Sequence, residues 1–370
     1  MNFSYWEQEY VSSNIDFLLV GMGLVGLQTA IQLKTKHPNA RVVAVDKATL
    51  HTAASTRNAG FACFASISEI RDDLQSQPAE NVYGTIRKRY DGIQKLRNTY
   101  GDSAIGYQEK GSQEIFTKRN KDELHAAIDS LQAINTILYN ELKLDRVFGY
   151  TSRCDLPSGI GSVQNNYEGQ LNTGKLYNTV YQKAALLGVI LYAGIEVLGW
   201  QKTTRFEVET EQGILLKTEH IILCTNGFSE MLTSENIVPA RGQVIVTEKL
   251  DKLPCEGLHF YDKGYYYWRD IDGRILLGGA RNLDSRGETT SEFGTNEAIL
   301  QELKQFMREH ITAKEVKIDY TWSGIMAIGK EGEKSPIVKE LEPGIVIAAR
   351  LGGMGVALSA VVAEEAVCLF

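Results

Sequence analysis

The sequence contains few cysteines and few prolines, and these absences exclude several classes of protein. Its 370 residues include five cysteines that stand far apart, with no C-x-x-C pair, and seven prolines. The cysteine pattern predicts a reduced, cytoplasmic protein rather than a disulfide scaffold. With 43% hydrophobic residues the chain is expected to bury a large core, and its length suggests about two domains.

Metal-binding spacing, targeting segments and an excess of positive charge are also missing. The six histidines show no H-x-x-x-H or H-x-E spacing, so no metal site is predicted. Residues 1–14 lack the basic and apolar regions of a signal peptide, and the longest nearly apolar stretch, 351–363, is shorter than the roughly 18 residues of a membrane span. A net charge of -7 disfavours wholesale nucleic-acid binding.

The most informative segment begins with an apolar run, 15–20, that suits a buried parallel strand. A G-x-G-x-x-G motif follows directly, and residues 27–33 continue it with helical spacing. The first glycine would make the tight turn, the second would let the backbone approach a pyrophosphate, and the third would let helix and strand pack closely. The helix N-terminus would then face the phosphates. The candidate dinucleotide-binding residues here are Gly21, Gly23, Leu24, Val25 and Gly26.

An acidic residue in the expected place strengthens the dinucleotide interpretation. A second strand, 41–45, ends in Asp46, whose carboxylate can accept both hydroxyls of an adenosine ribose. The side chain of the neighbouring Lys47 either influences which nucleotide binds or is simply exposed to solvent, and we favour the second interpretation. Two alternatives stay open from these residues alone, an ordinary glycine-rich turn in an α/β protein and a plain NAD enzyme.

The small-residue run after Asp46 favours FAD. The stretch 51–61 resembles the D-amino-acid oxidase, glycine oxidase and sarcosine oxidase superfamily of FAD-dependent oxidoreductases, whose members carry an A-S-x-x-N-A-G-like run here. In that family the run lies along the FAD pyrophosphate and beside the flavin. The resemblance therefore implies cofactor contacts for Ser55, Thr56, Arg57, Asn58, Ala59 and Gly60. The alternative is a loop that merely turns the chain.

Two later segments resemble other cofactor-binding parts of the same family. A strand near Val197 is implied to pass the adenine, and an A-T-G-like turn is implied at Cys224, Thr225, Asn226 and Gly227. Near the C-terminus a second glycine turn precedes a helix, and in the family this helix end faces the flavin N1 and C2 carbonyl, where negative charge collects on reduction. The residues implied there are Gly352, Gly353, Met354, Gly355 and Val356.

A tyrosine-rich strand pair, 264–269 and 274–279, is joined by a strong hairpin turn at Asp272 and Gly273. In the resembling enzymes such a sheet forms the wall over the flavin and supplies a tyrosine and an arginine that hold a substrate carboxylate. The resemblance therefore implies substrate contacts for Tyr265, Tyr267 and Arg269. An arginine can bind a carboxylate with two parallel hydrogen bonds. The alternative is that the aromatic residues only cover a sheet face.

Two departures from the family pattern refine the resemblance. Glycine and D-amino-acid oxidase-like members often have an arginine a few residues after this tryptophan-glycine motif, whereas here Gly324 is followed by Ile325 and no arginine comes close behind it. One arginine that would hold a substrate carboxylate is therefore expected to be missing. No cysteine occurs between Cys255 and Cys368, where sarcosine oxidases carry the covalent attachment, so noncovalent FAD is expected. Both features are closer to the amine and γ-glutamylputrescine oxidase branch.

The resemblance implies an α/β fold in which a Rossmann-like FAD-binding domain (1–78, 150–235 and 322–370) is interleaved with an antiparallel-sheet substrate domain (79–149 and 236–321). The implied reaction removes hydride from the carbon beside an amine nitrogen, passes it to flavin N5 and leaves an imine that water hydrolyses. The substrate is a small amine or amino acid, and the acceptor is oxygen or an electron carrier. Two alternatives remain: a flavin dehydrogenase of a 2-hydroxy acid and a module related to tRNA modification.

Overall fold

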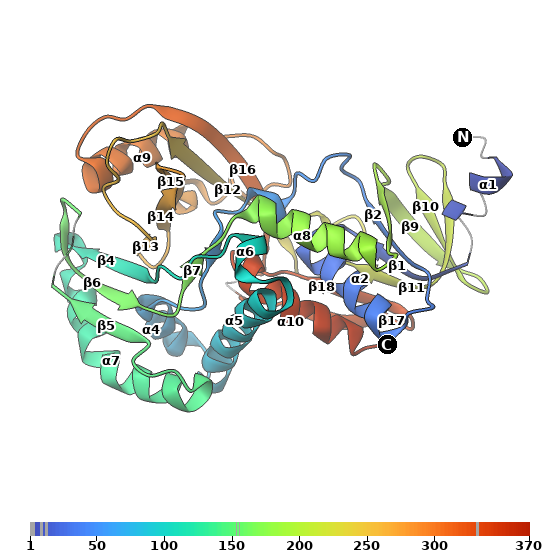
Figure 1. The fold of residues 1–370 in the computed structure, drawn as a ribbon, viewed down its shortest axis with the longest axis horizontal. Helices are drawn as coiled ribbons and strands as arrows, with labels where there is room; N and C mark the ends of the chain where they lie inside the picture. The colour runs from blue at the N-terminus through green and yellow to red at the C-terminus, as the bar shows by residue number, and fades with distance from the viewer. Residues whose placement is uncertain (1–3, 8–9, 12–13, 153, 155, 331–332) are drawn as a thin grey trace.

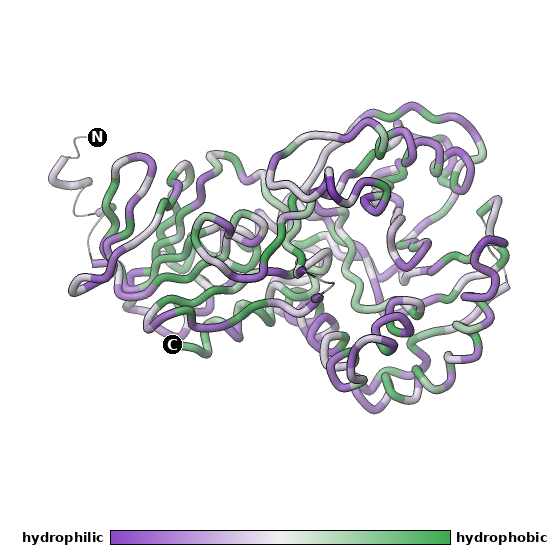
Figure 2. Tube along the Cα trace, turned by 180° about the vertical axis from the view of Figure 1, so that it is seen from behind, coloured by the Kyte–Doolittle hydropathy of each residue, from purple (hydrophilic) through white to green (hydrophobic). Residues whose placement is uncertain are grey.

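The computed structural model describes residues 4–7, 10–11, 14–152, 154, 156–330 and 333–370. Two large sheets organise it, one on the right of Figure 1 and one on the left. In the first sheet the apolar strand after the N-terminal segment lies between two parallel neighbours, and its side chains are almost completely buried. Figure 2 shows hydrophobic residues following these strands. The strand order is β17 (Ile337–Glu342), β18 (Ile345–Ala349), β11 (Leu215–Leu223), β1 (Ile15–Val20), β2 (Val42–Asp46) and β8 (Ile190–Ala193), with β10 (Phe206–Thr210) and β9 (Val197–Lys202) branching from β11.

The second sheet is antiparallel except where β4 and β13 run parallel. Its order is β16 (Ile318–Ile328), β12 (Val238–Thr247), β15 (Arg274–Gly279), β14 (Tyr266–Ile271), β13 (Leu258–Tyr261), β4 (Ser112–Thr117), β6 (Gly159–Asn165) and β5 (Phe148–Thr151). A short pair, β3 (Phe61–Ala62) and β7 (Gly169–Gln170), forms a third sheet. The chain enters and leaves the first sheet several times, so the predicted α/β fold with two interleaved units is confirmed.

Helices cover both sheets. The longer ones are α2 (Leu24–Lys36), α4 (Ile67–Ser76), α5 (Ala79–Tyr100), α7 (Lys121–Leu142), α8 (Thr173–Leu186), α9 (Glu297–Phe306) and α10 (Gly355–Val367). The short ones are α1 (Tyr5–Glu7), α3 (Ala54–Arg57), α6 (Asp102–Ile105), η2 (Lys118–Asn120), η3 (Asn226–Phe228), η4 (Arg281–Asp284) and η5 (Met307–Thr312). Among the described residues, no helix combines the length and apolarity that a membrane crossing needs.

Local sequence patterns predicted most of these elements. The apolar spacing over 82–100 and 122–142 is typical of amphipathic helices, and these segments form α5 and α7. The sequence offers Asn172 or Thr173 as the N-cap of α8, and in the structure Asn172 accepts a hydrogen bond from the Lys175 N–H at 2.9 Å. At the predicted hairpin turn both Asp272 and Gly273 have positive φ, as a type I′ turn requires. The sequence pattern predicts two short strands over 213–217 and 220–224, and this prediction is wrong, because residues of both segments form the single strand β11.

Strand pairing and helix packing bear on the domain boundaries. Strand β6 pairs with β4 and with β5 in the second sheet, although 150–235 was assigned to the first domain. Helix α5 packs closely on α10, where a Cβ at Gly92 would lie 1.8 Å from the Ala357 carbonyl oxygen. We therefore propose that the second domain includes β6 and that α5 belongs with the first.

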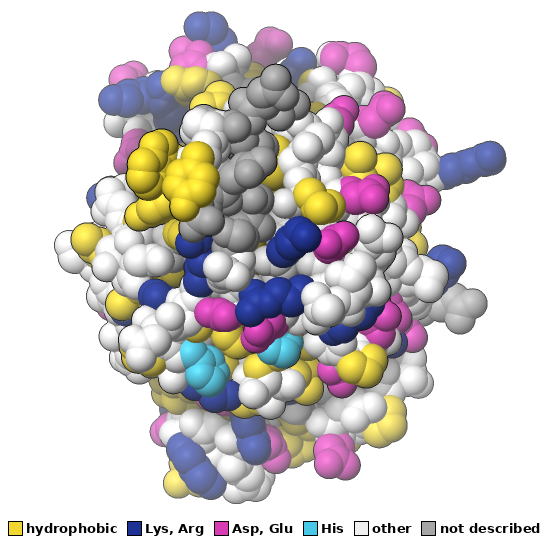
Figure 3. Space-filling view, turned by 90° about the vertical axis from the view of Figure 1, so that its right-hand side faces the viewer, with side chains coloured by type: hydrophobic (Ala, Val, Ile, Leu, Met, Phe, Trp, Pro, Cys, Tyr) yellow, Lys and Arg dark blue, Asp and Glu magenta, His cyan; other side chains and the backbone are white. Residues whose placement is uncertain are grey.

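The face at the right-hand end of the molecule carries interspersed basic and acidic side chains (Figure 3).

Candidate functional site

A cavity of about 980 Å³ is lined by residues of both large sheets. Val20 and Val45, at the ends of β1 and β2, contribute to one part of its wall, and Val244 and Tyr267 of the second sheet contribute to another. The carboxyl ends of parallel strands are where ligands bind in open α/β sheets. The cavity therefore extends from a characteristic nucleotide position to the aromatic face of the second sheet.

The predicted glycine turn lies on this wall. Helix α2 begins after Gly23, which offers no side-chain cap, and the first turn contains no acidic residue. A Cβ at Gly23 would approach only the Ser55 Oγ, at 3.1 Å, so the backbone is open to a ligand. The Tyr177 hydroxyl donates to the Met22 carbonyl at 2.8 Å and holds the turn. A helix N-terminus whose N-cap residue brings no side chain, and whose first turn brings no negative charge, favours a phosphate group.

Asp46 lies on the cavity wall at the end of β2. Its two carboxylate oxygens accept backbone hydrogen bonds from Met22 at 2.8 Å and from Ala48 at 2.9 Å. Each oxygen retains a lone pair, so the carboxylate can still accept ribose hydroxyls. Lys47 also lines the cavity, but its side chain is 47% exposed, lies 3.8 Å from Glu196 and covers the Phe228 ring.

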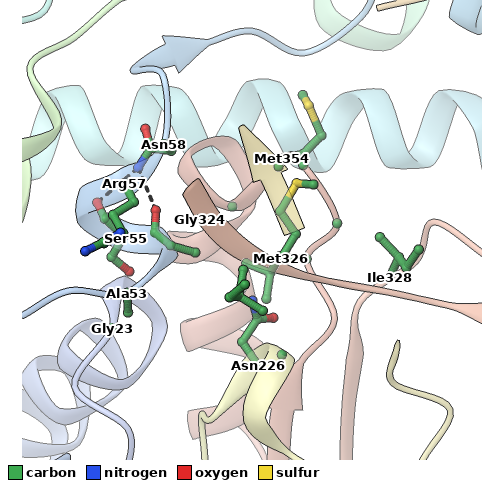
Figure 4. Close-up of a pocket in the computed structure, with 18 of the residues that line it drawn as sticks. Gly23, Ala53, Ser55, Arg57, Asn58, Asn226, Gly324, Met326, Ile328 and Met354 are labelled. Atoms are coloured by element: carbon green, nitrogen blue, oxygen red, sulfur yellow. Dashed lines mark hydrogen bonds between the residues drawn. The ribbon is translucent and has the colours of Figure 1, made fainter. Parts of the chain in front are cut away.

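The small-residue run folds against the glycine turn (Figure 4). The Ser55 Oγ accepts from the Leu24 N–H at 2.9 Å, and the Asn58 amide bonds to the carbonyls of Ala54 and Ser55. The Trp322 indole donates to the Arg57 carbonyl at 2.9 Å. These bonds tie α3 both to the N-terminus of α2 and to β16 of the second sheet, so the run bridges the two ends of the cavity.

A second helix N-terminus opens into the same cavity. Helix α10 begins after Met354, which makes no side-chain cap, and again no acidic residue occupies its first turn. Gly352 has a φ of +58°, and nothing lies near its Cβ position. The Asn226 side chain accepts from the Arg350 N–H at 3.1 Å and joins this turn to the one after β11. Two uncapped helix ends and an acidic strand end fit a dinucleotide cofactor.

The other end of the cavity is aromatic and apolar. Tyr267 points from β14 toward Phe61, with ring centroids 5.5 Å apart, and Tyr265, Phe260 and Met326 also line this part. Burial raises the pKa of Tyr267 to about 12, so its hydroxyl is neutral and can donate a hydrogen bond at physiological pH. A pocket of this character suits a small substrate with an apolar portion.

Arg269 does not line the cavity. It shares the strand face of Tyr267, but its side chain is only 4% exposed and lies behind Gly60, whose Cβ position is 2.9 Å from Nη2. Burial lowers the pKa of Arg269 to about 10, and no described residue pairs with its guanidinium in an ion pair. Arg269 is thus not among the residues that line the cavity, and its contact with a substrate stays a prediction.

Most of the other predicted site residues are brought together. Those on the wall are Gly21, Gly23, Leu24, Val25, Asp46, Lys47, Ser55, Arg57, Asn58, Ala59, Val197, Cys224, Thr225, Asn226, Gly227, Tyr265, Tyr267, Gly352, Gly353, Met354, Gly355 and Val356. Gly26, Thr56 and Gly60 lie behind it. Gly26 is covered by the Gly21 carbonyl, Thr56 bonds to the His51 carbonyl at 2.6 Å, and Gly60 packs against Leu171.

Sequence reasoning missed several wall residues, chiefly in segments without a motif. They include Cys63, Glu69, Lys263, Arg281, Ser285, Thr289, Phe293, Met326 and Lys334. Most belong to loops whose approach to the cavity depends on tertiary packing. For Arg281 one signal existed, since a basic residue follows directly on the glycine-rich end of a strand.

A buried carboxylate supports the segment after β3. The Glu168 side chain is 0% exposed, and its Oε1 accepts from the N–H groups of Phe64 and Ala65 at 2.7 and 3.0 Å. Burial raises the pKa of Glu168 to about 7, although the hydrogen bonds oppose that rise. The folded protein therefore holds a proton that the unfolded chain releases between its ordinary pKa of 4.5 and about 7. The resulting stability is complete below about pH 4.5 and is lost as the pH rises through 7.

Glu168→Gln should flatten this pH dependence. We expect the fall in unfolding free energy between pH 5 and pH 8 to shrink by roughly 3 kcal/mol, since one pKa unit corresponds to about 1.4 kcal/mol. Urea unfolding at the two pH values measures it, with the exposed Glu80→Gln as the matched control. An unchanged difference in the Glu168 variant would show that this carboxyl is ionised in the folded protein at both pH values.

Comparisons with known proteins agree with this architecture. The sequence profile of the family DAO, described as FAD dependent oxidoreductase, matches residues 16–369. The bifunctional protein ThiO/ThiG of Trichormus variabilis is 24% identical over 275 residues, which are 71% of this chain and 39% of that protein, so the match spans about two fifths of the relative.

Solved structures share the fold at low identity. Glycine oxidase from Geobacillus kaustophilus superposes with a TM-score of 0.71 at 19% identity, over 94% of this chain and 92% of the other. L-Amino acid deaminase from Proteus myxofaciens gives 0.75 at 14% identity, over 97% and 90%. Together with the cavity, the family profile over nearly the whole chain establishes that this protein belongs to the DAO family of FAD-dependent oxidoreductases.

Proposed function

We propose that this enzyme uses noncovalently bound FAD to oxidise a C–N bond of a small amine or amino acid. The observation that carries the proposal is that one continuous cavity joins two helix N-termini, neither capped by the side chain of its own N-cap residue, to an aromatic pocket. Its volume of about 980 Å³ is at the upper end of the usual range for ligand sites, which suits a dinucleotide together with a small substrate.

The proposed cofactor contacts follow the cavity wall. The N-terminus of α2 would bind the pyrophosphate, Asp46 the adenosine ribose, and the backbone near Val197 the adenine. The N-terminus of α10 would stabilise the negative charge that collects on the reduced flavin ring. No cysteine between Cys255 and Cys368 offers the covalent attachment known in sarcosine oxidases, which supports noncovalent binding.

The chain's own residues orient the substrate and shield it from water. Bound FAD would accept hydride from the carbon beside the amine nitrogen, and the imine product would be hydrolysed by water. Tyr267 would donate a hydrogen bond from a hydroxyl that stays protonated, while Phe61 and Met326 exclude water from the reacting carbon. Glycine oxidase and L-amino acid deaminase, which share the fold, are named for substrates with a C–N bond of this kind.

A finer placement in the amine and γ-glutamylputrescine oxidase branch is also a proposal. It is supported by the segment after Gly324, because glycine and D-amino-acid oxidases often carry an arginine a few residues on, whereas this chain has the buried, apolar Ile325 and then Met326 and Ala327. Met326, which follows, lines the cavity without adding charge.

Anaerobic reduction of the flavin tests the proposed function. We expect the absorbance of oxidised FAD to bleach with at least one member of a panel of D-amino acids, N-methyl amino acids and polyamine derivatives. The matched 2-hydroxy acids, with oxygen in place of nitrogen, should leave it unchanged. Bleaching by a 2-hydroxy acid alone would replace amine oxidation with the alcohol-oxidising alternative.

A further inference from the structure

The segment between β15 and α9, residues 281–296, covers part of the cavity. Apart from η4 it forms no helix or strand. Arg281, Ser285, Thr289 and Phe293 line the cavity, and the last three are also exposed to solvent. The segment therefore has the cavity on one side and water on the other, and we call it the strap.

A buried ion pair anchors the strap to β12 of the second sheet. The Glu288 side chain is 0% exposed and accepts from Arg241 at 2.8 and 2.9 Å, from Gln243 at 2.9 Å and from Asn296 at 3.2 Å. The Asn296 N–H also donates to the Gln243 side chain at 2.8 Å. The strap is thus fixed at two points, with Phe293 between them.

The Phe293 ring joins the strap to the first domain. Its centroid lies 6.1 Å from that of Phe228 in η3, and the Arg57 Cζ lies 4.6 Å from the Phe293 centroid. The Lys47 Nζ in turn lies 4.5 Å from the centroid of the Phe228 ring. All four side chains line the cavity. Two cations and two aromatic rings are therefore in contact in series along its wall.

The partners of Phe293 belong to the nucleotide end of the cavity. Lys47 directly follows the acidic end of β2, and Phe228 lies shortly after the end of β11, a strand of the same parallel group. Arg57 shares α3 with Ser55, whose Oγ accepts from the first backbone N–H of α2 at 2.9 Å. Ribose and phosphates bind at this edge of such a sheet. Phe293 is therefore placed beside the nucleotide half of a dinucleotide.

The cations of this series suit an anionic ligand. The Arg57 guanidinium donates to the Ser323 carbonyl at 2.9 Å, and no carboxylate of the described residues forms an ion pair with it. Lys47 has only the Glu196 carboxylate, at 3.8 Å. Aromatic rings beside these cations exclude water, which strengthens their attraction to a phosphate group.

We propose that the strap is part of the cofactor site and covers the nucleotide half of bound FAD, with Phe293 as its principal contact. FAD is then held by both domains, and its release requires the Phe293 ring to separate from Phe228 and Arg57. The inference rests on the noncovalent FAD binding proposed above, and it adds a contribution of the second domain to that site.

Titration of the apoprotein with FAD and with ADP tests this proposal. ADP carries the adenosine and the phosphates of FAD but no flavin. Phe293→Ala should weaken the binding of both ligands by about 10-fold, because an aromatic contact over the nucleotide is lost. FAD should also dissociate faster by a similar factor. Flavin fluorescence measures FAD binding and calorimetry measures ADP binding. Phe293→Tyr, which keeps the ring, should bind both ligands almost as the unmodified protein does.

Leu283→Ala is the matched control, since Leu283 lies in the same strap, is 56% exposed and does not line the cavity. It should bind both ligands unchanged. Phe293 is itself 43% exposed, so Phe293→Ala should leave the melting temperature of the apoprotein unchanged.

Three results with Phe293→Ala would overturn the proposal: unchanged affinity for both ligands, a change for only one of them, or a lower melting temperature of the apoprotein, which would show that the ring serves the fold instead. An enzyme that needs Phe293 to retain FAD but is bleached only by 2-hydroxy acids would overturn the proposed amine oxidation and leave this inference standing.

Discussion

Gly26→Ala is expected to abolish flavin retention and to destabilise the fold by about 3 kcal/mol or more. A Cβ at this position would lie 1.9 Å from the Gly21 carbonyl oxygen, a contact that real side chains do not make. Helix α2 would have to move away from β1, and its N-terminus would move with it. The backbone donors proposed to bind the pyrophosphate would then lose their geometry.

Flavin absorbance of the purified variant and urea unfolding measure the two effects of Gly26→Ala. Gly84→Ala is the control, because nothing lies within 4 Å of the Cβ position at Gly84 in helix α5. This control should keep its flavin and gain about 0.5–1 kcal/mol of stability from helix propensity. Full FAD retention by Gly26→Ala would contradict the proposed role of the glycine turn.

Arg241→Met should destabilise the protein by about 3–5 kcal/mol at neutral pH, because it leaves the buried Glu288 carboxylate without its counter-charge. In the unmodified protein burial alone would raise the pKa of Glu288, but the hydrogen bonds from Arg241 and Gln243 and the charge of Arg241 hold it below its ordinary value. The stability contributed by the pair is therefore present above about pH 4.5 and is lost as the pH falls through the lowered pKa.

In the Arg241 variant the difference from the unmodified protein should shrink at low pH, where Glu288 becomes protonated and its burial costs less. Urea unfolding at pH 7 and pH 4 measures this change. Lys88→Met is the matched control, since Lys88 and Glu365 form an ion pair whose side chains are 50% and 36% exposed, and its loss should change stability far less. A difference of the same size at both pH values would show that charge burial is not its cause.

The sequence predicted the parts of the site that depend on local chemistry. A strand, a glycine turn, a helix and an acidic strand end are all recognisable along the chain, and the structure places Gly21, Gly23 and Asp46 on one cavity wall. Close packing of Gly26 on Gly21 was predicted for the same reason, since the spacing of the motif itself requires it.

The parts that depend on distant contacts could not be predicted in this way. Strand alternation places Arg269 on the same face as Tyr267, but only the approach of Gly60 and Leu171 decides that its guanidinium stays behind the wall. Arg281 lies in an irregular segment, and only the placement of the charges around the cavity shows that no described carboxylate forms an ion pair with it. Functional residues often lie on loops that a rigid scaffold positions. The position of such a loop depends on tertiary packing, which the local sequence pattern does not reveal.

The absorbance spectrum of the purified protein, before and after acid or heat precipitation, tests the central claim most directly. We expect flavin bands in the native protein, and after precipitation we expect them in the supernatant, where the released cofactor should be FAD. A flavin that stays with the pellet would contradict noncovalent binding. A colourless protein that also fails to take up added FAD would contradict the assignment of the cavity as a flavin site.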